Sequence, residues 1–277
     1  MTNARIPTLM LLLALGCGGT ETAAGDDETS GAEVESGSIA AAIAGSHRLE
    51  ENRARDGDRH PAETLAFFGL EPGMTVVEMA PGGGWYTEIL APTLRGSGKL
   101  FAAIPDPDES EYGERFITFL GTHPEVYSEI ETVIFSPPER TSLGPDGSAD
   151  MVLTFRSTHG WINRGQADDV YAAMFKVLKP GGVLGVVQHR ADEGADPAVT
   201  SENGYVPQAY VVGLAEAAGF VLEEASEINA NPADDHDHPE GVWTLPPSLR
   251  LGDEGRAEYE AIGESDRMTL RFRKPAA

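Results

Sequence analysis

Residues 71–94 read EPGMTVVEMAPGGGWYTEILAPTL and join three features in one short segment. Met74–Met79 is an apolar run rich in β-branched residues, which is typical of a strand buried on both faces. A Pro81–Gly84 turn follows, and the run Trp85–Leu94 predicts a helix. This order places bare backbone N–H groups beside the carboxyl end of a strand, where a ligand can approach without meeting a Cβ atom.

The acidic residue of this segment helps to identify the ligand. Glu78 precedes Gly82 by four residues and Gly84 by six, and the loop lacks the G-x-G-x-x-G spacing that holds a pyrophosphate. The pattern resembles the S-adenosylmethionine (SAM) motif of methyltransferases, an acidic residue followed by alternating glycines. Ala80 replaces the first of those glycines, and we expect it to narrow the loop. A SAM site is therefore favoured over a nicotinamide dinucleotide site.

The rest of the chain alternates between predicted strands and helices, as a doubly wound α/β sheet requires. Further strands are expected at 99–104, 131–135, 150–155, after the glycine pair at 181–182, at 220–228 and at 268–273. Helices are expected from residue 38, at 61–69, 109–120, 166–178 and 207–218. The predicted fold class is α/β and Rossmann-like, with a mostly parallel seven-stranded sheet and helices on both faces.

Several segments together resemble a family of class I SAM-dependent methyltransferases that often carry signal peptides and whose substrates are poorly characterised. The resemblance covers residues 46–275 and includes RHPAETLAFFGLEPGMTVVEMAPGGGWYTEILAP (59–92), SADMVLTFRSTHGW (148–161), LKPGGVLGVVQHR (178–190), INANP (228–232), DHPEGVWTLPPSLRLGD (237–253) and GESDRMTLRF (263–272). It implies SAM as the cofactor, methyl transfer as the reaction and an antiparallel last strand.

The expected cofactor site lies outside the carboxyl ends of the strands. Glu78 is expected to accept a hydrogen bond from the methionine amino group, and the loop Ala80, Gly82, Gly83 and Gly84 to approach the ligand with its backbone. The family pattern implies an acid that holds the ribose at the end of the second strand.

Asp106 is the candidate for this ribose acid, displaced by about two places. Asp108 is an alternative, and Asp106 can also be read as a turn residue between two prolines.

The substrate side is expected after the fourth and fifth strands, which end in Arg156, Thr158, His159 and Trp161, and in His189 and Arg190. A histidine suits a general base, so His159 and His189 are the candidate catalytic residues. The histidines and arginines could instead hold an anionic substrate, or they could be hydrogen-bonded residues of the rim without chemistry.

A long insertion, residues 229–267, separates the last two predicted strands. We expect it to cap the substrate crevice, with Trp243 and Leu245 as packing residues. Its run Asp234–His238 offers metal-ligand side chains, but they are consecutive in one loop and the segment has no Cys, so no metal is predicted. Ahead of the glycine loop, Arg53, Arg55 and Arg59 form a local basic cluster.

The first 37 residues predict export rather than fold. Residues 1–17 combine Arg5, an apolar run too short to span a bilayer and a Gly16–Cys17 pair, which resembles a bacterial lipoprotein signal with Cys17 as the lipidated residue. An ordinary signal peptide or a short membrane segment in which the cysteine occurs by chance is the alternative. Residues 18–37 read as an acidic disordered tether, and 38–277 as one methyltransferase-like domain. The expected location is the cell envelope, at the outer membrane or the periplasmic face, with membrane attachment through the lipid anchor.

The charge balance limits the partners. Lys and Arg total 20 against 45 acidic residues, a net charge of −25, so nucleic acid is not expected as a partner. We expect a monomer that acts on a small molecule. SAM is made in the cytoplasm, however, so an exported methyltransferase needs an unusual supply. A non-catalytic envelope lipoprotein that binds another ligand in the same crevice is therefore the alternative.

Overall fold

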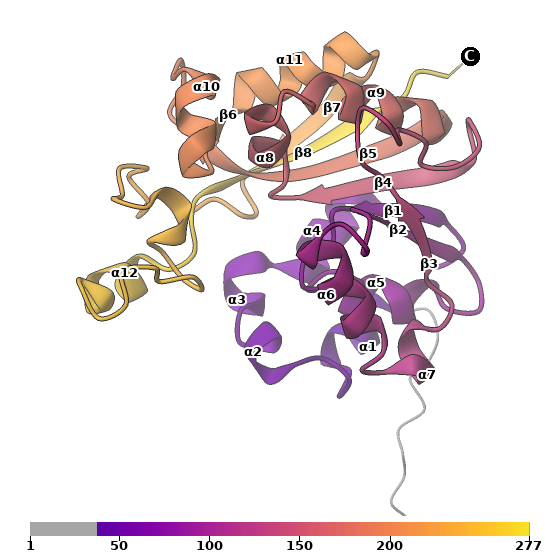
Figure 1. Ribbon diagram of the computed structural model, residues 1–277, viewed down its shortest axis with the longest axis horizontal. Helices are drawn as coiled ribbons and strands as arrows, with labels where there is room; N and C mark the ends of the chain where they lie inside the picture. Colours follow the sequence, from indigo (N-terminus) through magenta and orange to yellow (C-terminus); the bar gives the residue numbers. More distant parts are fainter. Residues whose placement is uncertain (1–37, 277) are drawn as a thin grey trace, which may run out of the picture. The chain divides into compact units, whose positions relative to one another are not determined.

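A mixed β-sheet forms the centre of the computed structural model, which describes residues 38–276 (Figure 1). Its strands are β1 (Thr75–Met79), β2 (Lys99–Ile104), β3 (Glu131–Ile134), β4 (Ala149–Phe155), β5 (Leu178–Ala191), β6 (Val206–Pro207), β7 (Val221–Ser226) and β8 (Arg267–Arg273). The order is β3-β2-β1-β4-β5-β8-β7, and the short β6 pairs with β5. Strands β1 to β5 run parallel to one another, whereas β8 is antiparallel to β5 and β7. The predicted Rossmann-like class with an antiparallel last strand is confirmed.

The strand order reverses between β1 and β4. The chain runs from β1 outward to β2 and β3, and then returns to β4 on the other side of β1. Ligands of open α/β sheets bind in the crevice outside the carboxyl ends of the strands at such a switch point. The glycine loop leaves β1 at this crevice, and Arg156 follows β4 there.

Helices cover both faces of the sheet (Figure 1). The helices are α1 (Ile39–Ala44), α2 (Glu50–Arg53), α3 (Asp56–Arg59), α4 (Pro61–Phe68), α5 (Thr87–Leu94), α6 (Glu111–Leu120), α7 (Pro124–Tyr127), α8 (Thr158–Asn163), α9 (Ala167–Val177), α10 (Pro197–Thr200), α11 (Gln208–Ala218) and α12 (Arg256–Ile262). Helices α8 to α11 lie on one side of the sheet in Figure 1, and α1 to α7 on the other.

The core is divided by the sheet because successive strand residues point to opposite faces. Val76 of β1 packs with residues of α4 and α5, whereas its neighbour Val77 packs with residues of α9 and β8. Both side chains are almost fully buried, as the continuous apolar run predicts. The edge strand β7 is polar instead, and its Glu223 binds Arg271 and Arg273 of β8. Charged side chains of this kind protect a sheet edge from pairing with another chain.

Several boundaries differ from the sequence expectation. The helix after the glycine loop begins at Thr87 rather than Trp85, because Trp85 and Tyr86 belong to the preceding turn. The Gly181–Gly182 turn lies inside β5, where the pairing with β4 shifts register. The four-residue helices and β6 were not predicted, since such short elements carry no periodic pattern.

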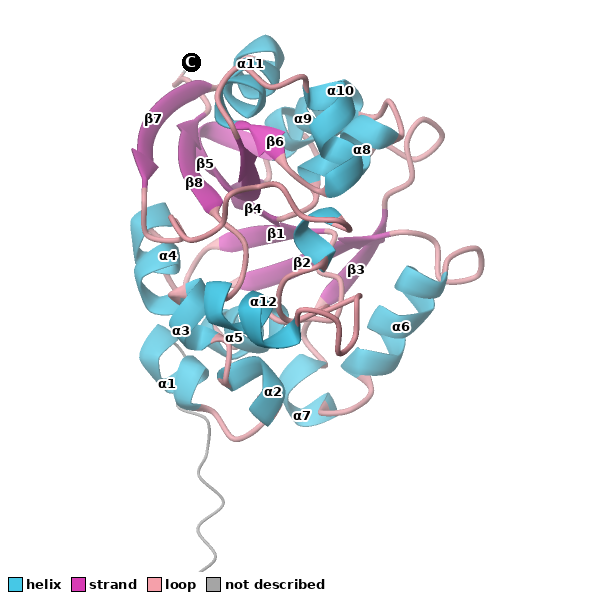
Figure 2. Cartoon of the chain, turned by 90° about the vertical axis from the view of Figure 1, so that its left-hand side faces the viewer, coloured by secondary structure: helices cyan, strands magenta, loops and turns pink. Residues whose placement is uncertain are grey.

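The insertion lies at one end of the sheet, where Figure 2 shows α12 and neighbouring loops in front of the strands. Among the described helices, none is long and apolar enough to cross a membrane. The predicted signal segment with Cys17 and the predicted tether lie outside the described residues.

Candidate active site

The glycine loop has a left-handed backbone at three alternating positions. The φ angles are 49° at Ala80, 60° at Gly82 and 83° at Gly84. A Cβ atom at Gly84 would lie 2.5 Å from the ring of Phe119, so packing requires a glycine there. A Cβ atom at Gly82 or Gly83 would meet no atom within 4 Å. These two glycines therefore leave an open wall that a ligand can approach.

Glu78 places a carboxylate next to this wall. The residue is 1% exposed, and the Thr87 hydroxyl donates a hydrogen bond to Glu78 Oε2 at 2.6 Å. Burial raises the pKa of Glu78 from 4.5 to about 7, and the hydrogen bond from Thr87 opposes this shift. A cation at the carboxylate would lower this pKa, because it would stabilise the charged form.

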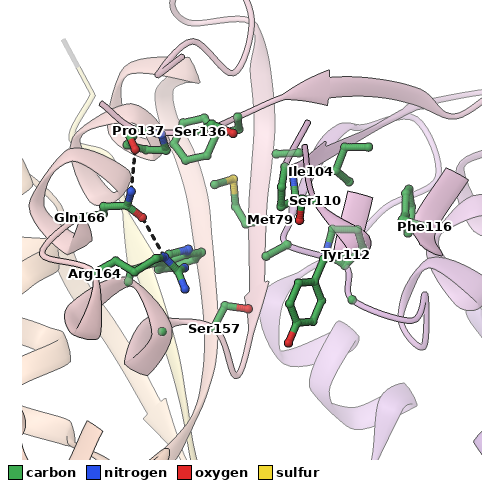
Figure 3. A pocket seen from close by; sticks show the side chains of 18 of the residues that line it. Met79, Ile104, Ser110, Tyr112, Phe116, Ser136, Pro137, Ser157, Arg164 and Gln166 are labelled. Atoms are coloured by element: carbon green, nitrogen blue, oxygen red, sulfur yellow. Dashed lines mark hydrogen bonds between the residues drawn. The ribbon is translucent and has the colours of Figure 1, made fainter. Parts of the chain in front are cut away.

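A cavity of about 520 Å³ lies between the carboxyl ends of β1, β2 and β4 (Figure 3). Its apolar wall includes Met79, Ile104 and Phe135. In Figure 3, Arg164 and Gln166 lie on one side and Tyr112 on the other. A mostly apolar cavity of this size with a few polar groups is typical of a small-molecule or cofactor site.

The candidate ribose acid is not among the residues that line this cavity. Asp106 accepts a hydrogen bond from the Asp108 backbone N–H at 3.0 Å and pairs with Arg140. Both hydrogen bonds lower the pKa of Asp106, and the one from the Asp108 backbone has the larger effect. Pro105 and Ser110 line the cavity instead.

A second cavity of about 360 Å³ adjoins the first. The two share lining residues from the glycine loop and from the segment after β4, among them Gly82, Arg156 and His159. The second cavity is also lined by Arg55 and Arg59 of the α2–α3 region, by His189 of β5, by Glu78 and Trp85, and by Trp243 and Glu264 of the insertion. The predicted cap therefore contributes wall residues, including Trp243, whereas Leu245 is fully buried.

The two candidate catalytic histidines lie together in this wall. The ring centroids of His159 and His189 are 5.9 Å apart, and His189 Nδ1 is 2.5 Å from the Ser265 hydroxyl oxygen. Burial lowers the pKa of His159 to about 4 and that of His189 well below its usual value. Both rings are neutral at pH 7. They are weak bases, and each can orient a polar group by a hydrogen bond.

The other predicted substrate residues do not lie together in one cavity wall. Trp161 lines the first cavity. The Thr158 N–H donates to Gln188 Oε1 at 3.1 Å, and the fully buried Thr158 side chain is absent from both cavity walls. Arg190 also lies outside both walls, because its guanidinium binds Asp266 and Glu227.

Sequence reasoning did not assign Arg55, Arg59 and Glu264 to the site. The basic cluster at 53–59 was a visible signal for the arginines. Glu264 had none, because it follows Arg55 by 209 residues and reaches the arginines only in the folded chain.

Hydrogen bonds within the protein hold the acidic loop of the insertion, residues 234–238. Ligand atoms of Asp234, Asp235 and His238 lie within 4.8 Å of one another, as a metal site would require. The Asp234 carboxylate, however, accepts hydrogen bonds from the Tyr205 hydroxyl at 3.0 Å and from the Asp266 N–H at 2.8 Å, and His238 Nε2 is 2.9 Å away. Its oxygens are thus engaged by protein donors that hold the loop.

Comparison with solved structures identifies the fold. A SAM-dependent methyltransferase from Aquifex aeolicus aligns with 81% of this chain and 94% of its own, at 17% identity and a TM-score of 0.53. The 4+2 cyclase SpnF aligns with 79% of this chain and 81% of its own, at 16% identity and a TM-score of 0.56. No protein-family model and no curated protein matches the sequence. The chain has the class I methyltransferase fold. Because one of the similar structures is described as a cyclase, the reaction has to be argued from the residues of the site and not from the fold.

Proposed function

We propose that the chain is a SAM-dependent methyltransferase that acts on a small molecule or an envelope component. The observation that carries the proposal is the open wall of Gly82 and Gly83 beside the buried Glu78. Backbone N–H groups of such a loop can bind the ligand, and Glu78 can pair with the methionine ammonium group. The first cavity is large enough for the adenosyl group. The residues present therefore fit SAM.

SAM supplies an electrophilic methyl group on a sulfonium sulfur. Glu78 and the glycine loop would hold the cofactor where the two cavities meet, since Gly82 lines both cavities and Glu78 lines the second. The cap residue Trp243, 5.8 Å from His159 between ring centroids, helps to exclude water. His159 and His189, both neutral, can accept a hydrogen bond from an N–H or O–H group of the acceptor and orient its lone pair. Because their pKa values are low, we assign catalysis to proximity and orientation rather than to a strong base.

Calorimetric titration with SAM and its demethylated product S-adenosylhomocysteine tests the proposal. Wild type is expected to bind both ligands saturably, and Gly82→Asp to lose most of the affinity because its side chain enters the open wall. Gly252→Asp is the matched control, since Gly252 has a similar φ of 64°, free space for a Cβ atom and no place in either cavity wall. Absence of binding by folded wild type, or equal losses in both variants, would contradict the proposed site.

A non-catalytic ligand-binding function is the second candidate. It is favoured by Asp106, which binds Arg140 instead of lining the cavity, and by Ala80, which replaces a motif glycine. Incubation of the purified chain with methyl-labelled SAM and an envelope extract separates the two candidates. Label transferred by wild type but not by Gly82→Asp would contradict the non-catalytic function.

We also propose that the chain is anchored in the cell envelope through a lipidated Cys17. The support is the lipoprotein-like signal in residues 1–17. Metabolic labelling with a tagged fatty acid is expected to mark wild type and not Cys17→Ala. Unlabelled wild type would contradict the anchor while leaving the proposed reaction intact.

A further inference from the structure

The arginines around Glu264 carry more positive charge than this carboxylate can neutralise. Glu264 accepts hydrogen bonds from Arg55 Nε at 2.7 Å, Arg59 Nε at 2.9 Å and Arg267 Nη1 at 2.9 Å. Arg156 Nη1 lies 3.9 Å from the same carboxylate. Four guanidinium groups thus share Glu264, and three of them, those of Arg55, Arg59 and Arg156, also line the second cavity.

The neighbouring acids leave part of this charge unmatched. Asp58 interacts by charge with Arg267 and Arg55, so it adds a second carboxylate to the cluster. Glu78 lines the same cavity, but its pKa of about 7 means that much of it is protonated at neutral pH. Four guanidinium groups against Asp58 and Glu264 leave an excess of two positive charges.

Arg59 retains unused hydrogen-bonding capacity, and Arg156 combines a strained backbone with a desolvated charge. Arg59 is 3% exposed, and its buried Nη1 has no hydrogen-bond partner within the described residues. Its guanidinium carbon lies 4.8 Å from the centroid of the Trp85 ring, a cation–π contact. Arg156 has a φ of 60°, a conformation that is strained for a residue other than glycine, and burial lowers its pKa to about 10. An anion between these two groups would accept a hydrogen bond from Arg59 Nη1 and would offset the cost of desolvating the Arg156 charge.

The cofactor of the proposed function does not remove the excess. SAM has one carboxylate, but its ammonium and sulfonium groups bring one more positive charge than the carboxylate cancels. Its carboxylate can engage one of the arginines, and the cavity with SAM bound would still be positive. A second anionic ligand is therefore expected beside the cofactor.

We infer that the second cavity holds the methyl acceptor through an oxyanion group, either a carboxylate or a phosphate, bound by Arg55, Arg59 and Arg156. This inference rests on the proposed methyltransferase function. The planar fork of a guanidinium matches both oxyanions. The volume of about 360 Å³ restricts the acceptor to a small molecule. Trp243, a partly exposed residue of the wall, offers aromatic surface to the rest of that molecule.

The test uses benzoate and inorganic phosphate as oxyanion probes and benzamide as the neutral counterpart of benzoate. Each is titrated calorimetrically into the full-length chain, without ligand and saturated with S-adenosylhomocysteine. We expect at least one oxyanion to bind saturably in both states and benzamide not to bind. Arg55→Gln should weaken oxyanion binding by about tenfold or more, the loss expected for a charged hydrogen bond. Arg53→Gln, an equal charge change at an exposed arginine of α2, should leave it within about twofold.

The outcomes separate this inference from the proposed function. If cofactor binds but no oxyanion does, or if cofactor and oxyanion compete, the acceptor site is wrong and the methyltransferase proposal stands. If oxyanions bind but SAM and S-adenosylhomocysteine do not, the proposed function is contradicted and the acceptor role falls with it. Circular dichroism checks that Arg55→Gln is folded. Arg156 follows β4 and so lies in a different part of the cavity wall from Arg55, and Arg156→Gln should show the same loss of oxyanion affinity. Unchanged oxyanion affinity in both variants would overturn the inference.

Discussion

Replacing Glu78 by Gln is expected to stabilise the ligand-free protein and to weaken its binding of SAM. Glu78 is 1% exposed, and burial raises its pKa from 4.5 to about 7. Each pKa unit corresponds to about 1.4 kcal/mol, so ionisation of the buried Glu78 lowers the free energy of unfolding by about 3 kcal/mol at most. Gln has a similar shape, can still accept the hydrogen bond from Thr87, and carries no charge to desolvate.

The sign of the pH dependence follows from the raised pKa. The folded chain prefers protonated Glu78. The stability that wild type has with Glu78 protonated is therefore fully present below about pH 4.5 and is lost as the pH rises through about 7. The stability difference between Glu78→Gln and wild type should therefore grow in favour of the variant by about 2–3 kcal/mol between pH 5 and pH 8. SAM binding should weaken by about tenfold or more, because the variant loses a charge-assisted hydrogen bond.

Urea unfolding of both proteins at pH 5, 6.5 and 8 measures the first effect, and calorimetry with SAM at pH 8 measures the second. Glu63→Gln, an exposed position in α4, is the control and should show neither effect. A stability difference that does not change with pH would refute the buried ionisation of Glu78. Unchanged SAM affinity would refute its contact with the ammonium group.

Two further substitutions test the loop and the insertion. Ala80→Gly should raise the free energy of unfolding by about 1 kcal/mol and Tm by about 2–4 °C, because Ala80 has a φ of 49°; a lower Tm would contradict this strain. Asp266, 3.5 Å from His236 Nε2, raises the pKa of His236 to about 9, so the stability from this pair is present below pH 6.5 and lost as the pH rises through about 9. His236→Gln should therefore lower stability at pH 6 and have little effect at pH 10, as chemical unfolding at both pH values would show.

The fold was predictable because its central strands are buried on both faces. Such strands read as short apolar runs, and the glycine loop marks where the first one ends. The four-residue helices α2 and α3 were not predictable, because isolated segments of this length are unstable and depend on tertiary contacts. In this region Arg48 binds Asp56 at 2.7 Å, and Arg59 binds Glu264.

The candidate site was predictable where it depends on strand ends, and less so elsewhere. Gly82, Glu78 and His189 lie close together because parallel strands end at one edge of the sheet. Asp106 also follows a strand, but its side chain pairs with Arg140, a contact between distant residues that no local pattern reveals. The arginine cluster around Glu264 depends on contacts across more than 200 residues, so its charge excess became visible only in the folded chain.

A crystal structure of the chain with S-adenosylhomocysteine tests the central claim most directly. We predict that the adenosyl group lies in the cavity of about 520 Å³ and that the homocysteine ammonium group lies within hydrogen-bond distance of Glu78. We also predict that the backbone of Gly82 contacts the ligand. A ligand bound elsewhere, or a glycine loop that makes no contact with it, would contradict the account.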